Sequence, residues 1–414
     1  MAIAAAYFFC ILSAYYIIRP IRDQMGVAGG VRNLPWLWGG TLVAILIAHP
    51  PFAFLVARLS RLRFVSITYR FFMLNLFVFF VLLRVVPDDA TVWLGRVFYV
   101  WTSVFNLFIV SVFWAFMTDV FTTSRSKRVF GLIGGGGTLG ALIGAAITAF
   151  LVTRIGLPTL LLISIAFLEV GVRLVRGVAR ETGRLADVPD PAVVEARPIG
   201  GGALDGFKRL VRSPYLLGIS GYVFLYTISG TVLYFQTAEI VERFVVGAEA
   251  RTAFFAWIDV AVNALTLSTQ LFFTGRIIRL LGVAATLTVL PLVCVLGFTT
   301  VGVVPAVATI VVFVVLRRAT EFSVGKPARE TLFTVVGRDE RYKAKNLIDT
   351  FVYRTGDQIA AWSYRGLTVL GLTTSGIAFV VVPLAMIWAG LGLWLGRQAG
   401  KQPGGAGAPA PIPV

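Results

Sequence analysis

Charged side chains are scarce in this sequence. Asp, Glu, Lys and Arg make up 14% of its 414 residues, whereas hydrophobic residues make up 57%. A water-soluble domain needs more polar surface than this, so the chain is predicted to lie mostly within a lipid bilayer. Acidic residues are fewer than basic residues, which gives a net charge of +17. The basic residues fall in short clusters between apolar runs, a pattern typical of cytoplasmic loops and not of a nucleic-acid-binding face.

Cysteine and histidine are nearly absent. Cys10 and Cys294 both lie in apolar runs, so no disulfide framework is expected, and the single His49 is too little for a metal site. The sequence contains no G-x-S-x-G element and no phosphate-binding loop that ends in Lys-Ser/Thr. We therefore expect no enzyme, no cofactor and no bound metal.

A glycine-rich run, GLIGGGGTLGALIGAA at 131–146, contains a formal G-x-G-x-x-G at Gly135, Gly137 and Gly140. No predicted strand precedes it, so a dinucleotide site is rejected. Gly136, Gly140 and Gly144 recur every four residues, which favours close packing of two transmembrane helices. The alternative is a partly unwound start of the fifth helix that offers backbone amides to an anion.

Long apolar runs dominate the chain and predict an all-α membrane protein. About twelve spans of roughly 20 residues are expected, in two six-helix pseudo-repeats: 1–177 as the N-terminal half and 214–396 as the C-terminal half. The polar stretch 178–213 is predicted to be a cytoplasmic linker, and the Gly- and Pro-rich end 397–414 a disordered tail. The spans fall at 2–24, 34–58, 64–86, 90–119, 129–152, 157–177, 214–242, 251–275, 282–303, 304–323, 344–369 and 374–396.

Basic clusters follow the even-numbered spans, which predicts that both termini are cytoplasmic. Met1 opens directly into lipid-like sequence, which favours a natural start upstream. Abundant Arg, Ala and Gly with sparse Lys suggest a bacterial chain in the inner membrane. The clusters comprise Arg58, Arg61 and Arg63; Arg125, Lys127 and Arg128; the linker; Arg276 and Arg279; and Lys326, Arg329, Arg338, Arg341, Lys343 and Lys345.

Two short loops resemble those of the major facilitator superfamily of secondary transporters. ARLSRLR (57–63) and GRIIRLLG (275–282) are similar to that superfamily's Gly-x-x-x-Asp-Arg-x-Gly-Arg-Arg loop and stand at matching places in the two halves, although both lack its acidic residue. The resemblance implies twelve helices in two halves that transport a small solute by alternating access.

Further stretches resemble the ATP/ADP translocase family of nucleotide transporters and its free-living bacterial relatives. These are KPARETLFTVVGRDERYKAKNLIDTFVYRTGD (326–357), FWAFMTDVF (113–121) and SRSKRVFGLIGGGGTLGALIG (124–144). Arg354-Thr355-Gly356-Asp357 stands where those exchangers have Arg-x-Gly-Lys. This resemblance implies nucleotide transport by an antiporter.

Three charged residues close the first span, in SAYYIIRPIRDQMG (13–26). Arg19 lies about 27 Å along the helix from Met1, so one interpretation is that it snorkels to the outer interface. The other is that Asp23 holds one of Arg19 and Arg22 while the other arginine binds solute. Elsewhere in this half, Asn106 is a candidate contact and Asp119, which precedes a basic cluster, a candidate gating residue.

The second half carries deep polar residues in three spans. Asp259, Asn263, Thr266 and Gln270 form a stripe that must face protein or water. In the eleventh span, Arg354 lies roughly 13 Å from Lys345, near mid-membrane, and its spacing allows a pair with Asp357. A structural ion pair and a cavity-lining role are both open. Asp349 and Tyr353 share the face of Asp357, and Glu321 is spaced to pair with Arg317 or Arg318.

The leading hypothesis is a secondary transporter of a small, anionic or nucleotide-like solute. The predicted solute contacts are Arg19, Arg22, Asn106, Asp259, Asn263, Tyr353 and Arg354. The predicted coupling or gating residues are Asp23, Asp119, Glu321, Asp349 and Asp357. Its partners are the solute, the lipid bilayer and a coupling proton or counter-substrate. The alternatives are a proton-coupled transporter of a neutral or cationic solute, and a non-transporting receptor or lipid-handling protein.

Overall fold

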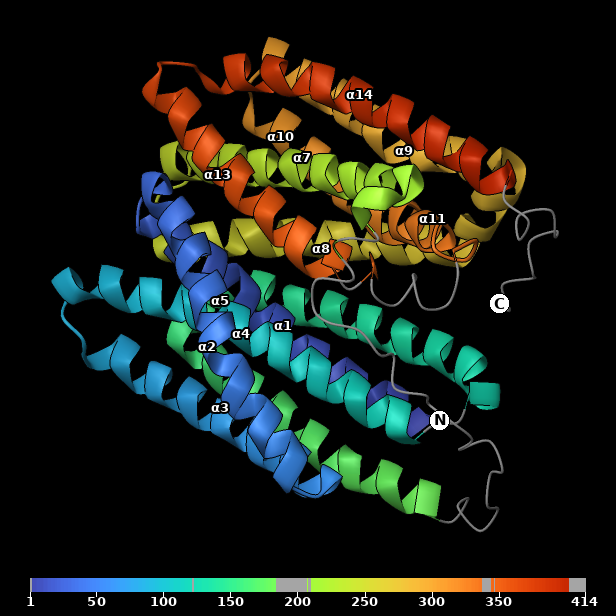
Figure 1. The fold of residues 1–414 in the computed structure, drawn as a ribbon. Coiled ribbons are helices and arrows are strands. Elements are labelled where there is room, and N and C mark those ends of the chain that lie inside the picture. The colour runs from blue at the N-terminus through green and yellow to red at the C-terminus, as the bar shows by residue number, and fades with distance from the viewer. Residues whose placement is uncertain are drawn as a thin grey trace. The chain divides into compact units, whose positions relative to one another are not determined.

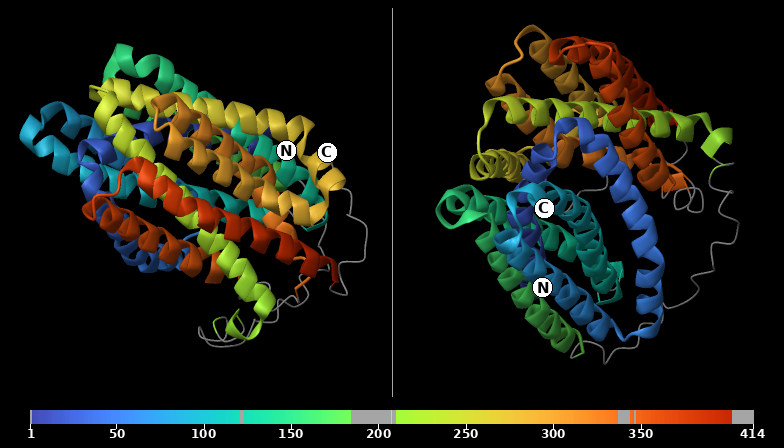
Figure 2. Two further views of the ribbon diagram at one scale, coloured as in Figure 1. Left: turned by 90° about the horizontal axis from the view of Figure 1, so that it is seen from above. Right: turned by 90° about the vertical axis from the view of Figure 1, so that its left-hand side faces the viewer.

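The computed structural model describes residues 2–120, 123–183, 207, 210–336, 344–345 and 347–401. Within these residues the secondary structure is helical and no strand occurs. An apolar chain in lipid favours this outcome, because a helix satisfies its backbone hydrogen bonds internally. Figure 1 shows the helices in chain order, and Figure 2 shows them from two further directions.

The first half of the sequence forms five helical elements and a short 3-10 turn. They are α1 (Ala2–Ala28), η1 (Val31–Asn33), α2 (Leu34–Arg58), α3 (Arg61–Val85), α4 (Asp88–Val120) and α5 (Thr123–Gly183). α5 contains the fifth and sixth predicted spans, and Gly156 interrupts it with a φ of 76°, which is accessible to glycine at no steric cost.

The second half follows the same pattern with two departures from α-helix. Its elements are α7 (Pro214–Phe244), α8 (Ala248–Phe272), α9 (Thr274–Val303), α10 (Val307–Thr320), η2 (Glu321–Gly325), α11 (Lys326–Thr331), η3 (Ile348–Val352), α13 (Tyr353–Val369) and α14 (Thr374–Lys401). η2 and η3 are π-helical turns. α10, η2 and α11 follow one another without a gap, so one helix runs from Val307 to Thr331.

The predicted spans correspond to helices of the described chain. Nine helical stretches there are long and apolar enough to cross a membrane. One of these, Phe130–Val178, is 49 residues long and holds two predicted spans. The tenth span corresponds to α10 with η2 and α11, and the eleventh to η3 with α13. The predicted boundary near Pro305 is also present, because α9 ends at Val303 and α10 begins at Val307. The chain is a multi-pass membrane protein.

The helices group into two compact units. Unit 1 takes its described residues from Met1–Asp190 and Val241–Ala264, and unit 2 from Pro191–Ile240 and Leu265–Ile412. Most of the predicted linker 178–213 lies outside the described residues, as do residues 402–414 of the predicted tail. Helix α14 continues to Lys401, five residues beyond the predicted end of the last span.

The closest helix pair in unit 1 is α1 with α5, and its contact confirms the predicted glycine packing. A Cβ built on Gly136 or Gly144 would come within 2.6 and 2.5 Å of the carbonyl oxygens of Ala5 and Ser13. A Cβ on Gly140 would overlap the backbone of Phe9. Because glycine lets the backbones approach, the Ser13 hydroxyl can donate a hydrogen bond to the Gly140 carbonyl at 3.0 Å. Figure 1 shows α1 beside α5 in this unit.

In unit 2, α9 and α14 are packed along their lengths, and a Cβ on Gly396 of α14 would overlap Ala284 of α9. α7 and α13 also meet at a glycine, since a Cβ on Gly356 would overlap the Thr227 hydroxyl. This contact lies beside Asp357, so the close approach fixes where that carboxylate meets α7.

Candidate functional site

The strongest charged contact in unit 1 joins α1 to α8. Arg19 Nη1 donates to Asp259 Oδ1 at 2.8 Å. The side chain of Asp259 is 2% exposed and that of Arg19 is 19% exposed. α1 continues nine residues past Arg19, to Ala28, so the guanidinium is about 14 Å short of the helix end. The interpretation that Arg19 snorkels to the interface is therefore wrong, because its guanidinium forms an ion pair with the Asp259 carboxylate near the middle of α8.

The polar stripe of α8 is buried over three of its four members. Asp259, Asn263 and Thr266 are 2–4% exposed. Asn263 Nδ2 donates to the Asp259 carbonyl of the preceding turn at 2.8 Å. Gln270 is exposed and donates to the Phe322 carbonyl at 3.2 Å. The stripe faces protein over the buried turns, as predicted, because a carboxylate and amide in contact with lipid would have no partners.

Arg22 and Asp23 form a second pair beside the first. Arg22 Nη1 lies 3.3 Å from Asp23 Oδ1, and both side chains are largely buried. The Arg22 guanidinium also stacks over the Tyr99 ring at 4.2 Å, and Trp38 Nε1 donates to the Tyr99 hydroxyl at 2.8 Å. Asp23 thus holds one arginine as predicted. The other arginine does not stay available, because Asp259 holds Arg19.

Two predicted residues of the first half stand apart from these pairs. Asn106 is half-buried on α4, and no hydrogen bond of its side chain is found within the described part of the chain. The side chain of Asp119 lies outside what the structure describes. The structure therefore does not join either residue to Arg19 or Arg22.

A second cluster of charges lies in unit 2 around Tyr226 of α7. Arg317 Nη2 donates to the Tyr226 carbonyl and to Ser229 Oγ, each at 2.9 Å. The guanidinium groups of Arg317 and Arg329 both lie 5.1 Å from the centre of the Tyr226 ring. Arg317 is only 5% exposed. These contacts bring α7, α10 and α11 together at one aromatic ring.

Glu321 pairs with Arg329, and the predicted pair with Arg317 or Arg318 is wrong. Arg329 Nη1 lies 3.2 Å from Glu321 Oε1, with exposures of 12% and 5%. Arg317 instead turns toward α7. In an unbroken α-helix, residues eight apart lie about 80° from each other around the axis. The wider π turn at Glu321–Gly325 removes most of this offset and brings Arg329 back to the face of Glu321.

The predicted residues of the eleventh span make other contacts than expected. Asp357 Oδ1 accepts a hydrogen bond from Thr231 Oγ1 at 3.1 Å, and no ion pair joins it to Arg354 within the part of the chain that is described. The reason is the close packing of α7 at Gly356, which presents Thr231 to the carboxylate. The Tyr353 ring lies 6.0 Å from that of Tyr226. Asp349 is exposed in the π turn η3.

Three residues of the unit 2 cluster carried little signal in the sequence. Arg329 reads as part of a cytoplasmic basic cluster, yet it lies in α11 and is mostly buried. The spacing of Arg317 points only to Glu321 as its partner. Tyr226 is one of many aromatic residues in the seventh span. An arginine thirteen residues inside a predicted span was the signal available, because charges at that depth are expensive and mark functional sites.

The described residues show no obvious set of side chains that would bind a metal or cofactor. Among the described residues, no group of three or more His, Cys, Asp or Glu side chains comes together. Both clusters consist of arginines paired with single carboxylates, together with tyrosine and hydroxyl groups.

Comparison with solved structures identifies the fold. No family profile and no curated protein matches the sequence. Among solved structures, the chain is similar to an autoinhibited peptide transporter of the POT family, with a TM-score of 0.63 at 14% identity over 99% of each chain. It is also similar to a bacterial homologue of the human lysosomal transporter Spinster, in an inward-facing, unoccupied conformation. There the TM-score is 0.55 at 15% identity, over 98% of this chain and 99% of the other.

The chain has the major facilitator fold. This confirms the predicted all-α membrane architecture, and at these identities the likeness concerns the fold alone.

Proposed function

We propose that the protein is a secondary transporter that moves a small anionic solute across the membrane by alternating access. The fold supports this proposal, since both similar structures are described as transporters. In this type of transport, two six-helix halves expose a central site to the two sides of the membrane in turn. The bacterial inner membrane and cytoplasmic termini belong to the same proposal.

The observation that carries the proposal is the Arg19–Asp259 ion pair. Placing a charge at the centre of a membrane costs about 2.5–3.5 kcal/mol per residue on insertion scales. An apolar pair of similar size would avoid that cost, so the buried pair is better explained by a function than by stability. Arg19 and Asp259 are 240 positions apart in sequence. A solute anion that competes with Asp259 for Arg19 would open this contact, which links solute binding to helix movement.

An anionic solute is favoured by the basic groups near the membrane centre. The solute contacts predicted from the sequence stay part of the proposal, and they are Arg19, Arg22, Asn106, Asp259, Asn263, Tyr353 and Arg354. A nucleotide is the finer proposal, and it rests on the sequence resemblance to the ATP/ADP translocase family. Asp23, Asp119, Glu321, Asp349 and Asp357 are the proposed coupling or gating residues.

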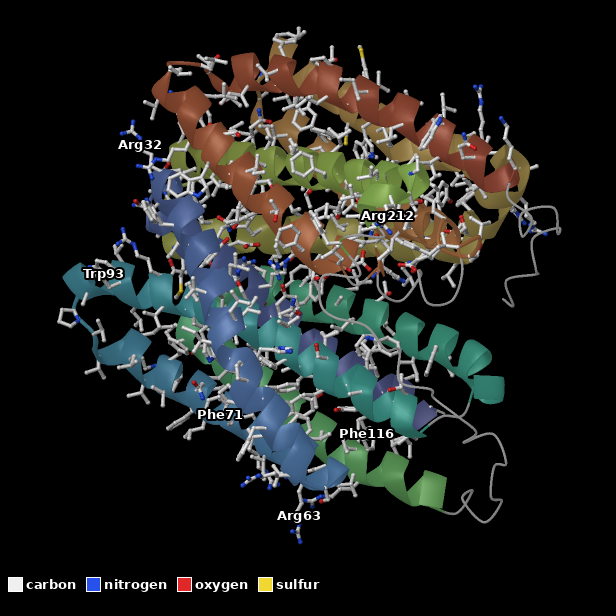
Figure 3. All side chains as sticks on the ribbon, viewed as in Figure 1. Arg32, Arg63, Phe71, Trp93, Phe116 and Arg212 are labelled. Carbon is white, nitrogen blue, oxygen red and sulfur yellow. The ribbon has the colours of Figure 1, made fainter. Side chains whose placement is uncertain are left out.

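The test is transport by purified protein in liposomes. Labelled ATP, ADP and a panel of organic anions are offered, with and without internal counter-substrate and a proton gradient. We expect uptake or exchange of an anion, and its loss in Arg19→Gln. Arg212→Gln is the matched control, since Arg212 is an exposed arginine just before α7 (Figure 3). Failure of the wild type to move any anion on the panel would reject the anionic solute.

The second candidate is a proton-coupled transporter of a neutral or cationic solute. It is favoured by the buried carboxylates of Asp259 and Glu321, which are 2% and 4% exposed. Arg354→Gln separates the two candidates, because losing this cation should abolish transport of an anion and spare transport of a cation. Transport of both anionic and cationic solutes is therefore measured for Arg354→Gln.

A further inference from the structure

Arg317 of α10 has no carboxylate bonded to it among the described residues. Two guanidinium groups, Arg317 and Arg329, lie against the Tyr226 ring, and one carboxylate, Glu321, pairs with Arg329. Glu321 and Asp357 act on Arg317 electrostatically, but neither forms an ion pair with it. A buried cation without a bonded counter-charge is costly, so this site is suited to a ligand that supplies one.

The hydrogen bonds of Arg317 leave its Nε unused, and the Cys294 thiol lies beside the guanidinium. Its Nη2 serves the Tyr226 carbonyl and Ser229 Oγ, both neutral acceptors. Its Nε is buried and has no acceptor within the described part of the chain. A guanidinium offers donors in a planar fork that matches the two oxygens of a carboxylate or phosphate. Both hydrogens of Nη2 are used, so the unpaired Nε, on a side chain that is 5% exposed, is a buried donor left for one oxygen of such an anion.

The neighbouring backbone is shaped to hold these groups. A Cβ on Gly230 would lie 2.8 Å from Arg317 Nη2, so glycine at this position makes room for the guanidinium against α7. A Cβ on Gly325 would lie 2.7 Å from Glu321 Oε2, so glycine also makes room for the carboxylate. The π turn Glu321–Gly325 sits between the two arginines, and such turns are frequent at functional sites.

We propose that Arg317, fixed by Tyr226 and Ser229, binds an oxyanion of the solute, either a phosphate or a carboxylate group. This proposal rests on the transport function above and assigns that function a solute contact in α10. Beside the site, Glu321 forms its ion pair with Arg329, so it does not occupy the donors of Arg317. The Tyr226 ring supports both cations through its π face.

The position of Arg317 fits a solute contact. It lies about 15 Å along the axis from Val307, near the middle of the unbroken helix that ends at Thr331. Solute sites of transporters with this architecture lie near the bilayer midplane. A lipid headgroup carries the same phosphate chemistry but resides at the interface, so a dissolved oxyanion is the proposed occupant.

Binding in lipid-free neutral detergent tests the proposal without requiring transport. Inorganic phosphate, pyrophosphate and citrate are titrated by calorimetry at constant ionic strength, and short-chain phosphatidylglycerol is titrated separately. We expect saturable binding of at least one dissolved anion. Arg317→Gln should abolish it, and Arg317→Lys and Ser229→Ala should weaken it at least about tenfold through loss of the positioned fork. Arg212→Gln should bind like the wild type.

Arg317→Lys and Ser229→Ala keep the test informative if Arg317→Gln fails to fold, since both retain a cation at the site. Unchanged anion affinity in these two variants would overturn the proposal. So would wild-type protein that binds no dissolved anion, or binds phosphatidylglycerol only. Uptake is measured on the same preparations. Anion binding without transport would support this site and contradict the proposed function. Transport by the wild type, with unaltered anion binding in Arg317→Lys, would support the proposed function and contradict this site.

Discussion

Single charged residues determine most of the chemistry of this protein. The chain is poor in charge, and four arginines in its helices donate to a carboxylate or a backbone carbonyl at distances of 2.8–3.3 Å, namely Arg19, Arg22, Arg317 and Arg329. Removing one partner of such a pair leaves the other buried without a counter-charge, which costs about 3–5 kcal/mol. Double substitutions therefore reveal which partner a residue uses.

The Arg19–Asp259 pair gives the first prediction. Arg19→Gln or Asp259→Asn alone should lower the thermal midpoint of the purified protein in detergent, because each leaves one buried charge unpaired. The double variant should be more stable than the sum of the two losses predicts, since neither charge then remains. Thermal unfolding followed by tryptophan fluorescence measures this coupling. Additive losses would show that the two side chains do not interact.

The Glu321–Arg329 pair gives the second prediction. The exchange Glu321→Arg with Arg329→Glu should recover part of the stability that either single substitution removes. The exchange of Glu321 with Arg317 should recover none, because Arg317 bonds to Tyr226 and Ser229 on α7. The same thermal assay in detergent compares the two exchanges. Recovery by the Arg317 exchange alone would contradict the pairing described here.

At the scale of elements, glycine sets how closely helices approach. The α1–α5 contact is built on Gly136, Gly140 and Gly144, and the α7–α13 contact on Gly356. These approaches matter for function because α1 carries Arg19 and α13 carries Asp357. A shift of either helix would move a charged side chain away from its partner.

Gly140 gives the third prediction, with a matched control in the same helix. A Cβ on Gly140 would overlap Phe9, whereas one on Gly135 would meet no atom within 4 Å. Gly140→Ala should destabilise the protein by about 1–3 kcal/mol through overpacking. Gly135→Ala should be neutral or stabilising by up to about 1 kcal/mol, because alanine is the better helix former. Equal effects of the two substitutions on the thermal midpoint would contradict the packing at Gly140.

At the same scale, the π turns change which residues share a helix face. Without the turn at Glu321–Gly325, Arg329 would lie on another face of the helix from Glu321. A sequence pattern based on α-helical spacing misses such a turn, and this explains why the partner of Glu321 was predicted incorrectly.

For the whole molecule, the clusters of arginine predict which loops face the cytoplasm. Arg32 in η1 and Arg63 at the start of α3 flank the two ends of α2, and both are exposed (Figure 3). The positive-inside pattern places Arg63 in the cytoplasm and Arg32 outside. The native cysteines, Cys10 and Cys294, are buried and should give little background.

Labelling of single cysteines in intact cells gives the fourth prediction. In a chain with Cys10→Ser and Cys294→Ser, Arg32→Cys should react with a membrane-impermeant maleimide added outside. Arg63→Cys should react only after the membrane is made permeable, because the label cannot otherwise reach the cytoplasmic end of α2. The reverse pattern would invert the proposed orientation of the chain.

The sequence by itself determined the helical, membrane-spanning character of the described chain and the glycines at which α1 and α5 touch. Lipid leaves the backbone no partner except itself, so apolar run length specifies the spans directly. Only the tertiary structure decided the partners of the charged side chains. Asp259 is 240 positions from Arg19, and Arg317 turns to α7 because Gly230 makes room for it. These pairings depend on helix register and on the space left by neighbouring side chains, and the spacing of residues along one helix gives information on neither.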